Sequence, residues 1–165
     1  MRTIARKLTP LGKIVSIAAK LRKKGKKIVT TNGVFDILHL GHVTYLESAR
    51  KLGDVLIVGI NSDASVRRIK GPKRPLNSKK ARASCVAALE CVDYVVVFGE
   101  DDPRKFLSAV KPAIHVKGGD YRGKMGKIIE KEIVEHNGGK IVLKQMVKGC
   151  STSSLIEKIV KVYGS

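Results

Sequence analysis

Residues 27–42 read KIVTTNGVFDILHLGH, and this stretch decides the fold that the sequence predicts. It begins with a β-branched run, Lys27–Thr31, which has the length and composition of a buried parallel strand. Gly33 follows the run and lets the backbone approach a ligand closely. Helical spacing of apolar residues begins near Gly41. A strand, a glycine and a helix in this order predict the first half of a βαβ unit, which binds ligands where its strand ends.

The same alternation continues along the chain, as further β-branched runs are followed by segments with helical spacing. The expected strands are 27–31, 55–60, 94–98, 113–117 and 141–147, and the expected helices are 11–21, 41–52, 78–89, 102–110, 127–136 and 151–162. Strands that alternate with helices predict an α/β protein. We therefore expect a Rossmann-like, doubly wound parallel sheet of five strands with helices on both faces. The basic stretch 67–80 is expected to be a surface loop beside the ligand edge of this sheet.

The composition fits one compact domain. The chain has 165 residues, of which 43% are hydrophobic. We expect a single domain over residues 1–165, with residues 1–25 forming a helical extension packed on it. Three cysteines without a CxxC pair indicate a reducing compartment. The sequence shows neither a secretion signal nor an apolar run of about 18 residues that could span a membrane, so we expect a cytoplasmic protein.

The balance of charge predicts an anionic partner. Lys and Arg number 33 against 14 Asp and Glu, which gives a formal net charge of +19. Nucleic acid, an acidic membrane and phosphorylated small molecules all satisfy this requirement. Aromatic residues make up only 4% of the chain, which disfavours a protein that binds single-stranded nucleic acid by stacking.

Two histidines, His39 and His42, lie three residues apart where the helix after the first strand begins. This spacing places both imidazoles on one side of the first turn, at a helix end whose free N–H groups attract anions. There they could hold a polyphosphate and stabilise the charge that gathers on it during group transfer. The alternative is that one histidine caps the helix while the other lies in solvent. A metal pair fits less well, because no cysteine or carboxylate lies at ligand spacing.

The stretch TNGVFDILHLGH, residues 31–42, resembles the signature of the cytidylyltransferase-like nucleotidyltransferases, in which an HxGH element follows a GxFD element at a strand end. The resemblance implies that His39 and His42 are catalytic, because in that family the two histidines contact the nucleotide's phosphates and stabilise the transition state. It also implies a nucleotide-binding role for the residues around them: Asn32, Gly33, Val34, Phe35, Asp36 and Gly41.

Within this family the sequence is most similar to the bacterial adenylyltransferases that act on D-glycero-D-manno-heptose 1-phosphate. The likeness covers nearly the whole chain and rests on these motifs: LIVGINSDASV at 56–66, KGP at 70–72, RPLN at 74–77, CVDYVV at 91–96, VKGGDY at 116–121 and STS at 151–153. It implies transfer of the adenylyl group of ATP to the sugar 1-phosphate, which gives ADP-heptose and pyrophosphate. Mg²⁺ would accompany ATP, bound through the phosphates and not by a metal site of the protein. The resemblance also implies a homodimer.

The motif KGGDY follows the fourth expected strand. Lys117 supplies a charge that suits a phosphate, and we expect it to be catalytic. Gly118 lets the backbone approach a base or sugar, and Asp120 can accept hydrogen bonds from ligand hydroxyls or amines, so both are expected to bind the nucleotide. A simple glycine turn is the alternative.

Hydroxyl groups open the last expected helix. Ser151, Thr152 and Ser153 stand where free N–H groups and side-chain oxygens together make a phosphate cradle. Helix capping would explain one of these residues, but a run of them favours the cradle. In the family the matching stretch binds the nucleotide's phosphates.

Three more residues are expected to bind the substrate phosphate: Arg82, Asp63 and Lys70. Arg82 stands where the family has a basic residue after the proline-containing loop, although a solvated arginine is the alternative. Asp63 follows the second strand, where plain helix capping would also explain it. Lys70 and Arg74 lie in the basic stretch and could close over a bound triphosphate.

One departure from related enzymes narrows the choice of substrate. Cytidylyltransferases for glycerol 3-phosphate and archaeal FAD synthetases typically carry RTxGIST, whereas residues 146–152 read MVKGCST and lack the arginine. This favours the heptose type, while glycerol 3-phosphate cytidylyltransferase and FMN adenylyltransferase remain alternatives. The chain has no room for the sugar kinase domain of bifunctional heptose enzymes, so we expect a stand-alone transferase. A basic nucleic-acid-binding module is a remote alternative that rests on net charge alone.

Overall fold

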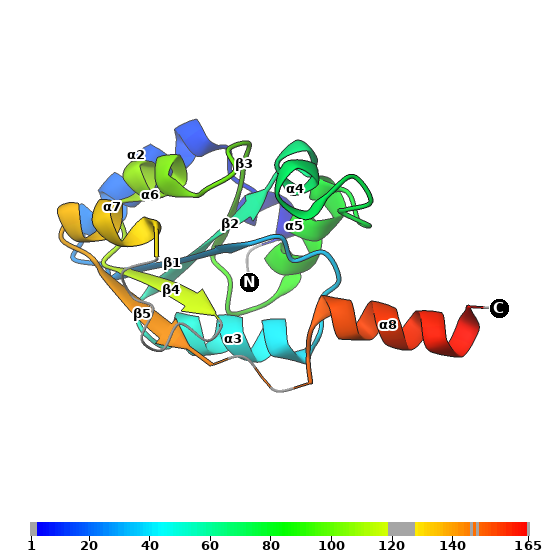
Figure 1. Cartoon of the computed structure of the whole chain (residues 1–165). Helices are drawn as coiled ribbons and strands as arrows, with labels where there is room; N and C mark the ends of the chain where they lie inside the picture. Colours follow the sequence, from blue (N-terminus) through cyan, green and yellow to red (C-terminus); the bar gives the residue numbers. More distant parts are fainter. Residues whose placement is uncertain (1–2, 119–127, 146, 148, 165) are drawn as a thin grey trace.

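The computed structural model describes residues 3–118, 128–145, 147 and 149–164 (Figure 1). Its five strands are β1 (Ile28–Gly33), β2 (Val55–Asn61), β3 (Tyr94–Phe98), β4 (Ile114–Gly118) and β5 (Lys140–Lys144). They form one sheet in the order β3-β2-β1-β4-β5, and every neighbouring pair is parallel. The predicted doubly wound, five-stranded parallel sheet is confirmed.

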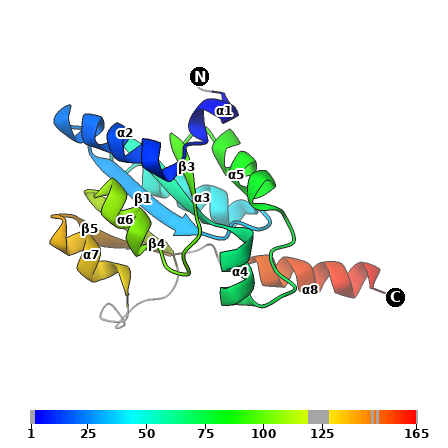
Figure 2. The ribbon, with the colours of Figure 1, turned by 90° about the horizontal axis from the view of Figure 1, so that it is seen from above.

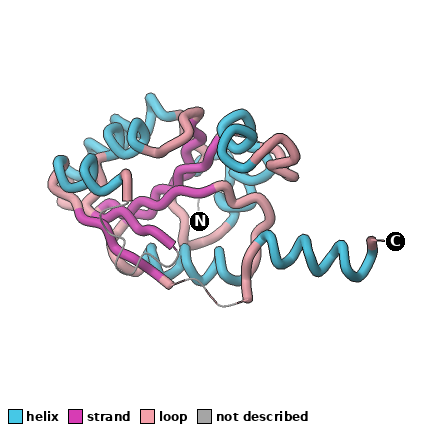
Figure 3. The backbone as a smooth tube through the Cα atoms, in the orientation of Figure 1, coloured by secondary structure: helices cyan, strands magenta, loops and turns pink. Residues whose placement is uncertain are grey.

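Helices connect these strands at nearly the predicted positions (Figure 3). They are α1 (Ile4–Lys7), α2 (Leu11–Lys23), α3 (Leu40–Arg50), α4 (Asp63–Lys70), α5 (Lys79–Ala88), α6 (Arg104–Val110), α7 (Glu130–His136) and α8 (Thr152–Tyr163). One expectation was wrong at both ends, because residues 79–80 of the expected loop begin α5 and residues 67–70 belong to α4, a helix that the sequence did not predict. Ser62 caps that helix by accepting a hydrogen bond from the Ser65 N–H, and Val66 is fully buried. The loop is therefore confined to residues 71–78.

Two apolar cores cover the two faces of the sheet. In Figure 1, α2, α6 and α7 lie on one face and α3 lies on the other. Side chains such as Ile14 and Phe106 pack with Ile57 on the first face, whereas Leu46 and Val86 pack on the second face with the alternate residues of the same strands. Because both faces are covered, the strands are nearly continuous apolar runs, as β2 is along its whole length.

The N-terminal helices pack on this sheet (Figure 2). Leu8 forms an isolated parallel bridge with Val95 of β3, and the Lys7 ammonium donates a hydrogen bond to the Leu89 carbonyl at 2.8 Å. Further along, the Arg22 guanidinium donates to the carbonyl of Val110 at the end of α6. These contacts hold α1 and α2 against the edge and one face of the sheet.

The strand order places a ligand crevice at the end of β1. The chain moves from β1 to β2 on one side and reaches β4 on the other, so the connections diverge at the carboxyl end of β1. Tyr45 of α3 contacts both β1 and β4 there. Its hydroxyl donates a hydrogen bond to the Val116 carbonyl of β4 at 2.8 Å and lies 2.6 Å from the Thr31 hydroxyl of β1. The fold thus fixes the start of α3 beside this crevice.

Helix α8 extends away from the body of the protein (Figure 1). None of its residues is buried, and Val160, Val162 and Tyr163 are 60%, 59% and 81% exposed. Its polar residues Glu157, Lys158 and Lys161 fall on the opposite side of the helical repeat. The helix therefore presents an uncovered apolar face. Among the described residues, no helix combines the length and the apolar character that crossing a bilayer requires.

Candidate active site

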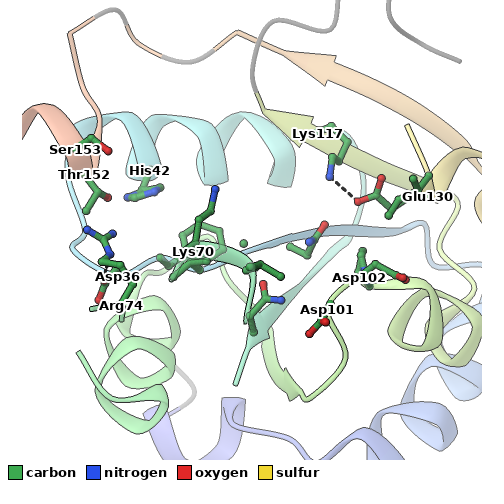
Figure 4. A pocket seen from close by; sticks show the side chains of 18 residues that line it. Asp36, His42, Lys70, Arg74, Asp101, Asp102, Lys117, Glu130, Thr152 and Ser153 are labelled. Atoms are coloured by element: carbon green, nitrogen blue, oxygen red, sulfur yellow. Dashed lines mark hydrogen bonds and ion pairs between the residues drawn. The ribbon is translucent and has the colours of Figure 1, made fainter. Parts of the chain in front are cut away.

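A cavity of about 600 Å³ opens at the carboxyl end of the sheet (Figure 4). Its wall contains residues from the ends of β1, β2, α4 and β4, from the loops before α5 and α6, and from the starts of α3, α7 and α8. Ten residues that the sequence predicts as site residues meet in this wall: Asn32, Gly33, Val34, Phe35, Asp36, His42, Lys70, Lys117, Thr152 and Ser153. Residues up to 121 positions apart in the sequence, Asn32 and Ser153, are thus brought to one place.

An unusual backbone conformation at Phe35 positions His42. Phe35 has a φ of 50°, in the left-handed region that non-glycine residues rarely adopt, and its side chain is buried. Its ring lies over Gly33, where an added Cβ would come within 3.0 Å of the ring, and its centroid is 5.1 Å from that of His42. Gly33 therefore leaves room for the ring that lies beside the His42 imidazole, and a larger residue would crowd that ring.

The two histidines form a stacked pair at the start of α3. His39 is the N-cap residue, but its side chain makes no capping hydrogen bond. Its ring stacks on His42 with centroids 3.9 Å apart, and the Nδ1 atoms of both rings are buried without a hydrogen-bond partner. Burial, helped by the neighbouring His39, lowers the pKa of His42 to about 4, and burial also lowers the pKa of His39. Both imidazoles are therefore neutral at pH 7 in the ligand-free protein.

The first turn of α3 lies beside Cys150, which precedes α8. A Cβ on Gly41 would be 3.1 Å from the Cβ of Cys150 and 3.1 Å from the His39 ring, so a larger residue would crowd both neighbours. Ser151 caps α8 in a capping box with Ser154, and its hydroxyl is 3.0 Å from the Ser154 N–H. Of the predicted cradle, Thr152 and Ser153 line the cavity, whereas the Ser151 hydroxyl is engaged in capping.

Asp36 does a different task from the predicted contact with nucleotide. Its carboxylate is buried and accepts hydrogen bonds from the N–H groups of Leu76 and Asn77, at 3.0 and 2.8 Å. The same carboxylate lies 3.0 Å from Nε of Arg74. Asp36 therefore anchors the loop over residues 71–78 and holds the Arg74 guanidinium at the cavity wall.

Arg82 and Asp63 are also engaged inside the protein, so the predicted phosphate contact of Arg82 was wrong. Arg82 is 1% exposed, and its guanidinium donates to three carbonyls and to the Asp63 carboxylate at 2.9 Å. The carbonyls belong to Val34, Asn61 and Asn77, at 2.5, 2.7 and 3.0 Å. A guanidinium with these partners has no free edge for a phosphate, and it braces the ends of β1 and β2 against the loop.

The predicted residues Lys117 and Gly118, which end β4, and Asp120, which follows it in sequence, differ in where they stand. The Lys117 ammonium lines the main cavity and forms an ion pair with Glu130 of α7 at 2.5 Å. Gly118 lines a smaller adjoining cavity of about 170 Å³, together with Tyr45 and His42. Asp120 lies outside the described residues.

Three acidic residues of the wall were missed by the sequence analysis: Asp101, Asp102 and Glu130. The first two follow β3, so the rule that ligand-binding residues follow strands would have found them. Asp101 is paired with Arg68 at 2.6 Å and Asp102 with Arg104 at 2.8 Å. Glu130 begins a helix far from any motif, and no sequence signal points to it. Within the described ranges, no group of three or more His, Cys, Asp or Glu is arranged to hold a metal ion.

A family model described as Cytidylyltransferase-like matches residues 30–158 of this chain. The chain belongs to the cytidylyltransferase-like family. The match covers the end of β1, both histidines and most of α8, so the cytidylyltransferase-like region includes the described cavity wall. The predicted family resemblance is confirmed.

Relatives with known names agree with this family. The chain is 49% identical over 158 residues to a protein named bifunctional protein HldE from Geobacter sulfurreducens, covering 96% of this chain and 32% of the relative. It is 54% identical over 145 residues to the protein of the same name from Nitratiruptor sp., covering 87% of this chain and 30% of the relative. The chain thus spans about a third of the length of these relatives.

Solved structures support the same conclusion. A lipopolysaccharide core biosynthesis protein from Thermoplasma volcanium superposes with a TM-score of 0.63 and 31% sequence identity, covering 76% of this chain and 100% of that protein. Pantoate-beta-alanine ligase from Francisella tularensis also gives a TM-score of 0.63, over 96% of this chain and 78% of the ligase, at 18% identity. The second likeness shows the fold alone.

We predict that Arg82→Met destabilises this cytidylyltransferase-like chain by about 3–5 kcal/mol, the usual cost of removing one partner of a buried ion pair. The substitution keeps much of the side-chain volume but leaves Asp63 and three carbonyls without their donor. Urea denaturation measures the loss. Arg104→Met, which breaks the exposed pair with Asp102, is the matched control and should change stability little. Equal losses in the two variants would contradict the bracing role.

The partly buried His42 imidazole should make stability depend on pH. The unfolded chain binds a proton at His42 near the usual pKa of 6.5, whereas the folded chain binds it only near pH 4. Between these values the unfolded state holds more protons, so stability falls as the pH falls from about 6.5 toward 4. We expect the melting temperature, measured by circular dichroism, to fall less between pH 7 and pH 5 in His42→Asn than in the wild type. An unchanged loss would show that His42 is not buried in its neutral form.

Proposed function

We propose that this chain transfers the adenylyl group of ATP to D-glycero-D-manno-heptose 1-phosphate, forming ADP-heptose and releasing pyrophosphate. The observation that carries the proposal is one cavity wall in which His42, Thr152 and Ser153 meet the basic side chains of Lys70 and Arg74. Family membership, the 49% identity to a protein named HldE and the sequence motifs of heptose enzymes support the choice of chemistry and acceptor.

The reaction needs no nucleophile from the protein. An oxygen of the sugar phosphate attacks the α-phosphorus of ATP in line, a new P–O bond forms, and the bond to pyrophosphate breaks. Catalysis of such a transfer comes from positioning the two phosphates and from stabilising the charge on the oxygens. The cavity of about 600 Å³ has room for small ligands of this kind.

Each group in the phosphate-binding part of the wall has a distinct task. The neutral His42 imidazole can donate one N–H to a phosphate oxygen, in a position fixed by the rings of Phe35 and His39. Thr152 and Ser153 offer hydroxyls and backbone N–H groups at the start of α8, whose dipole favours an anion. Lys70 and Arg74 add positive charge where the triphosphate would lie.

Mg²⁺ is the cofactor that we propose. The carboxylates of Asp36, Asp102 and Glu130 in the cavity wall are already paired with cationic side chains. The wall therefore fits a metal that enters bound to the phosphates of ATP better than one held by the protein alone. Mg²⁺ commonly takes its ligands from phosphates, water and one or two carboxylates. When bound, it would neutralise part of the triphosphate charge.

We also propose that the protein works as a homodimer in a reducing compartment such as the cytoplasm. All three cysteines are free thiols, which supports the compartment. The exposed apolar face of α8 supports association with a second copy, because large uncovered apolar patches are uncommon on monomers. Sedimentation velocity should show a dimer that Val160→Glu converts to monomer. A monomeric wild type would refute this proposal.

A pyrophosphate-release assay tests the function. ATP and CTP are each combined with heptose 1-phosphate, mannose 1-phosphate, glycerol 3-phosphate and FMN. We expect release from ATP with heptose 1-phosphate to exceed every other combination at least about tenfold, because uniform phosphate contacts cannot choose among acceptors but hydroxyl contacts can. Preference for CTP with glycerol 3-phosphate, or for ATP with FMN, would overturn the assignment.

The role of His42 is tested in the same assay. We expect His42→Ala to lower kcat by about 10²–10³-fold, the usual effect of removing one donor that stabilises transition-state charge. Thr44→Ala changes the same helix away from the cavity wall and serves as the control. Near-normal turnover by a folded His42→Ala protein would rule out the catalytic role of this histidine.

A further inference from the structure

The buried ion pair between Lys117 and Glu130 is not used by the phosphate chemistry proposed above. The Lys117 side chain is 17% exposed and that of Glu130 is 4% exposed, with Nζ and Oε1 only 2.5 Å apart. Both residues line the main cavity. Taking two charges out of water is costly, and apolar residues would often serve stability as well. A buried pair in a ligand cavity therefore suggests a task in binding.

The pair lies apart from the groups expected to bind phosphate. Figure 4 shows His42, Thr152 and Ser153 on one side of the cavity and Lys117 with Glu130 on the other. Asp101 and Asp102 lie on the same side as the pair. Glu130 offsets the charge of Lys117, and Asp101 and Asp102 are paired with Arg68 and Arg104, so these pairs give a phosphate no uncompensated positive charge.

The hydrogen-bonding groups here are suited to hydroxyls. The Lys117 ammonium has three N–H donors, of which one is directed at Glu130 Oε1. Among the described residues, the second carboxylate oxygen of Glu130 has no other hydrogen-bond donor and can act as an acceptor. Oδ1 of Asn32, a third residue of the cavity wall, is buried and has no hydrogen-bond partner among the described residues. A hydroxyl group both donates and accepts, whereas a phosphate oxygen accepts only, so a pair of hydroxyls can satisfy donors and acceptors together.

We propose that Asn32, Lys117 and Glu130 form a subsite for the vicinal hydroxyl groups of a sugar. The inference rests on the proposed function, which brings two sugars into the cavity: the acceptor and the ribose of ATP. The subsite would place a neutral sugar ring on one side while its phosphate points to the His42 side. It also changes the task of Lys117 from holding a phosphate to holding a hydroxyl.

Calorimetric titration of Glu130→Gln tests the subsite without relying on turnover. The ligands are heptose 1-phosphate, inorganic phosphate, ATP and 2′,3′-dideoxy-ATP. If the acceptor sugar supplies the hydroxyls, the variant should bind heptose 1-phosphate at least about tenfold more weakly, because a charged hydrogen-bond acceptor is lost. Its affinity for ATP should not change. If ribose supplies the hydroxyls, the variant should bind ATP more weakly by the same factor, while its affinity for 2′,3′-dideoxy-ATP should equal that of the wild type.

The proposal is overturned if 2′,3′-dideoxy-ATP and inorganic phosphate bind Glu130→Gln more tightly, since an unpaired Lys117 would then be a phosphate-binding cation. It is also overturned if no affinity changes. Failure of this proposal can be told apart from failure of the proposed function. If the pyrophosphate assay identifies a different acceptor, the comparison of ATP with 2′,3′-dideoxy-ATP binding still tests the subsite.

Two further variants protect the test from misfolding. Glu135→Gln lies on the same helix, alters an exposed pair with Lys131 at 4.0 Å, and should bind every ligand as the wild type does. Asn32→Ala removes the unpartnered oxygen without touching the ion pair, and should weaken the same hydroxyl-bearing ligand as Glu130→Gln. Weakening of inorganic phosphate by Asn32→Ala to the same degree would contradict the assignment.

Discussion

One buried guanidinium holds together the parts of the chain that form the cavity. Arg82 reaches from α5 to the carbonyls after β1 and β2 and to the Asp63 carboxylate, all within 3.0 Å. A cation this deep in a protein is stable only when its donors are satisfied, so the backbone around it can take few other positions. The ends of two neighbouring strands and the start of the 71–78 loop are fixed by this requirement.

A second buried charge, the Asp36 carboxylate, holds the 71–78 loop in place from the side of β1. Asp36 accepts hydrogen bonds from two backbone N–H groups and holds Arg74, so the guanidinium of this loop residue stays at the cavity wall. The charged side chains around the cavity thus fall into two groups, according to whether they have a partner within the protein. Side chains with internal partners build the wall, and groups such as His42, Lys70 and Thr152 remain for a ligand. The net charge of +19 by itself says little about this site.

The fold was largely predictable, because alternation of apolar runs with helical spacing is a local property that the sequence displays directly. All five strands and their parallel pairing agree with that pattern, whereas α4 was not predicted, because its surface is strongly basic and Val66 is its only buried apolar residue. The candidate site was predictable in part. Residues after β1 and at the start of α8 meet in one cavity, but Arg82 and Asp36 resemble ligand-binding residues in sequence and prove to be engaged with the protein.

By itself, the sequence determined the sheet, the family and the histidine pair at the start of α3, because each depends on residues that are close together in the chain. Only the tertiary structure decided which charged groups face the cavity. Glu130 meets Lys117 because the start of α7 lies beside the end of β4, and Arg74 meets Asp36 because the loop folds back toward the end of β1. Such pairings join residues 13 and 38 positions apart, and no local pattern encodes which cation a carboxylate will take as its partner.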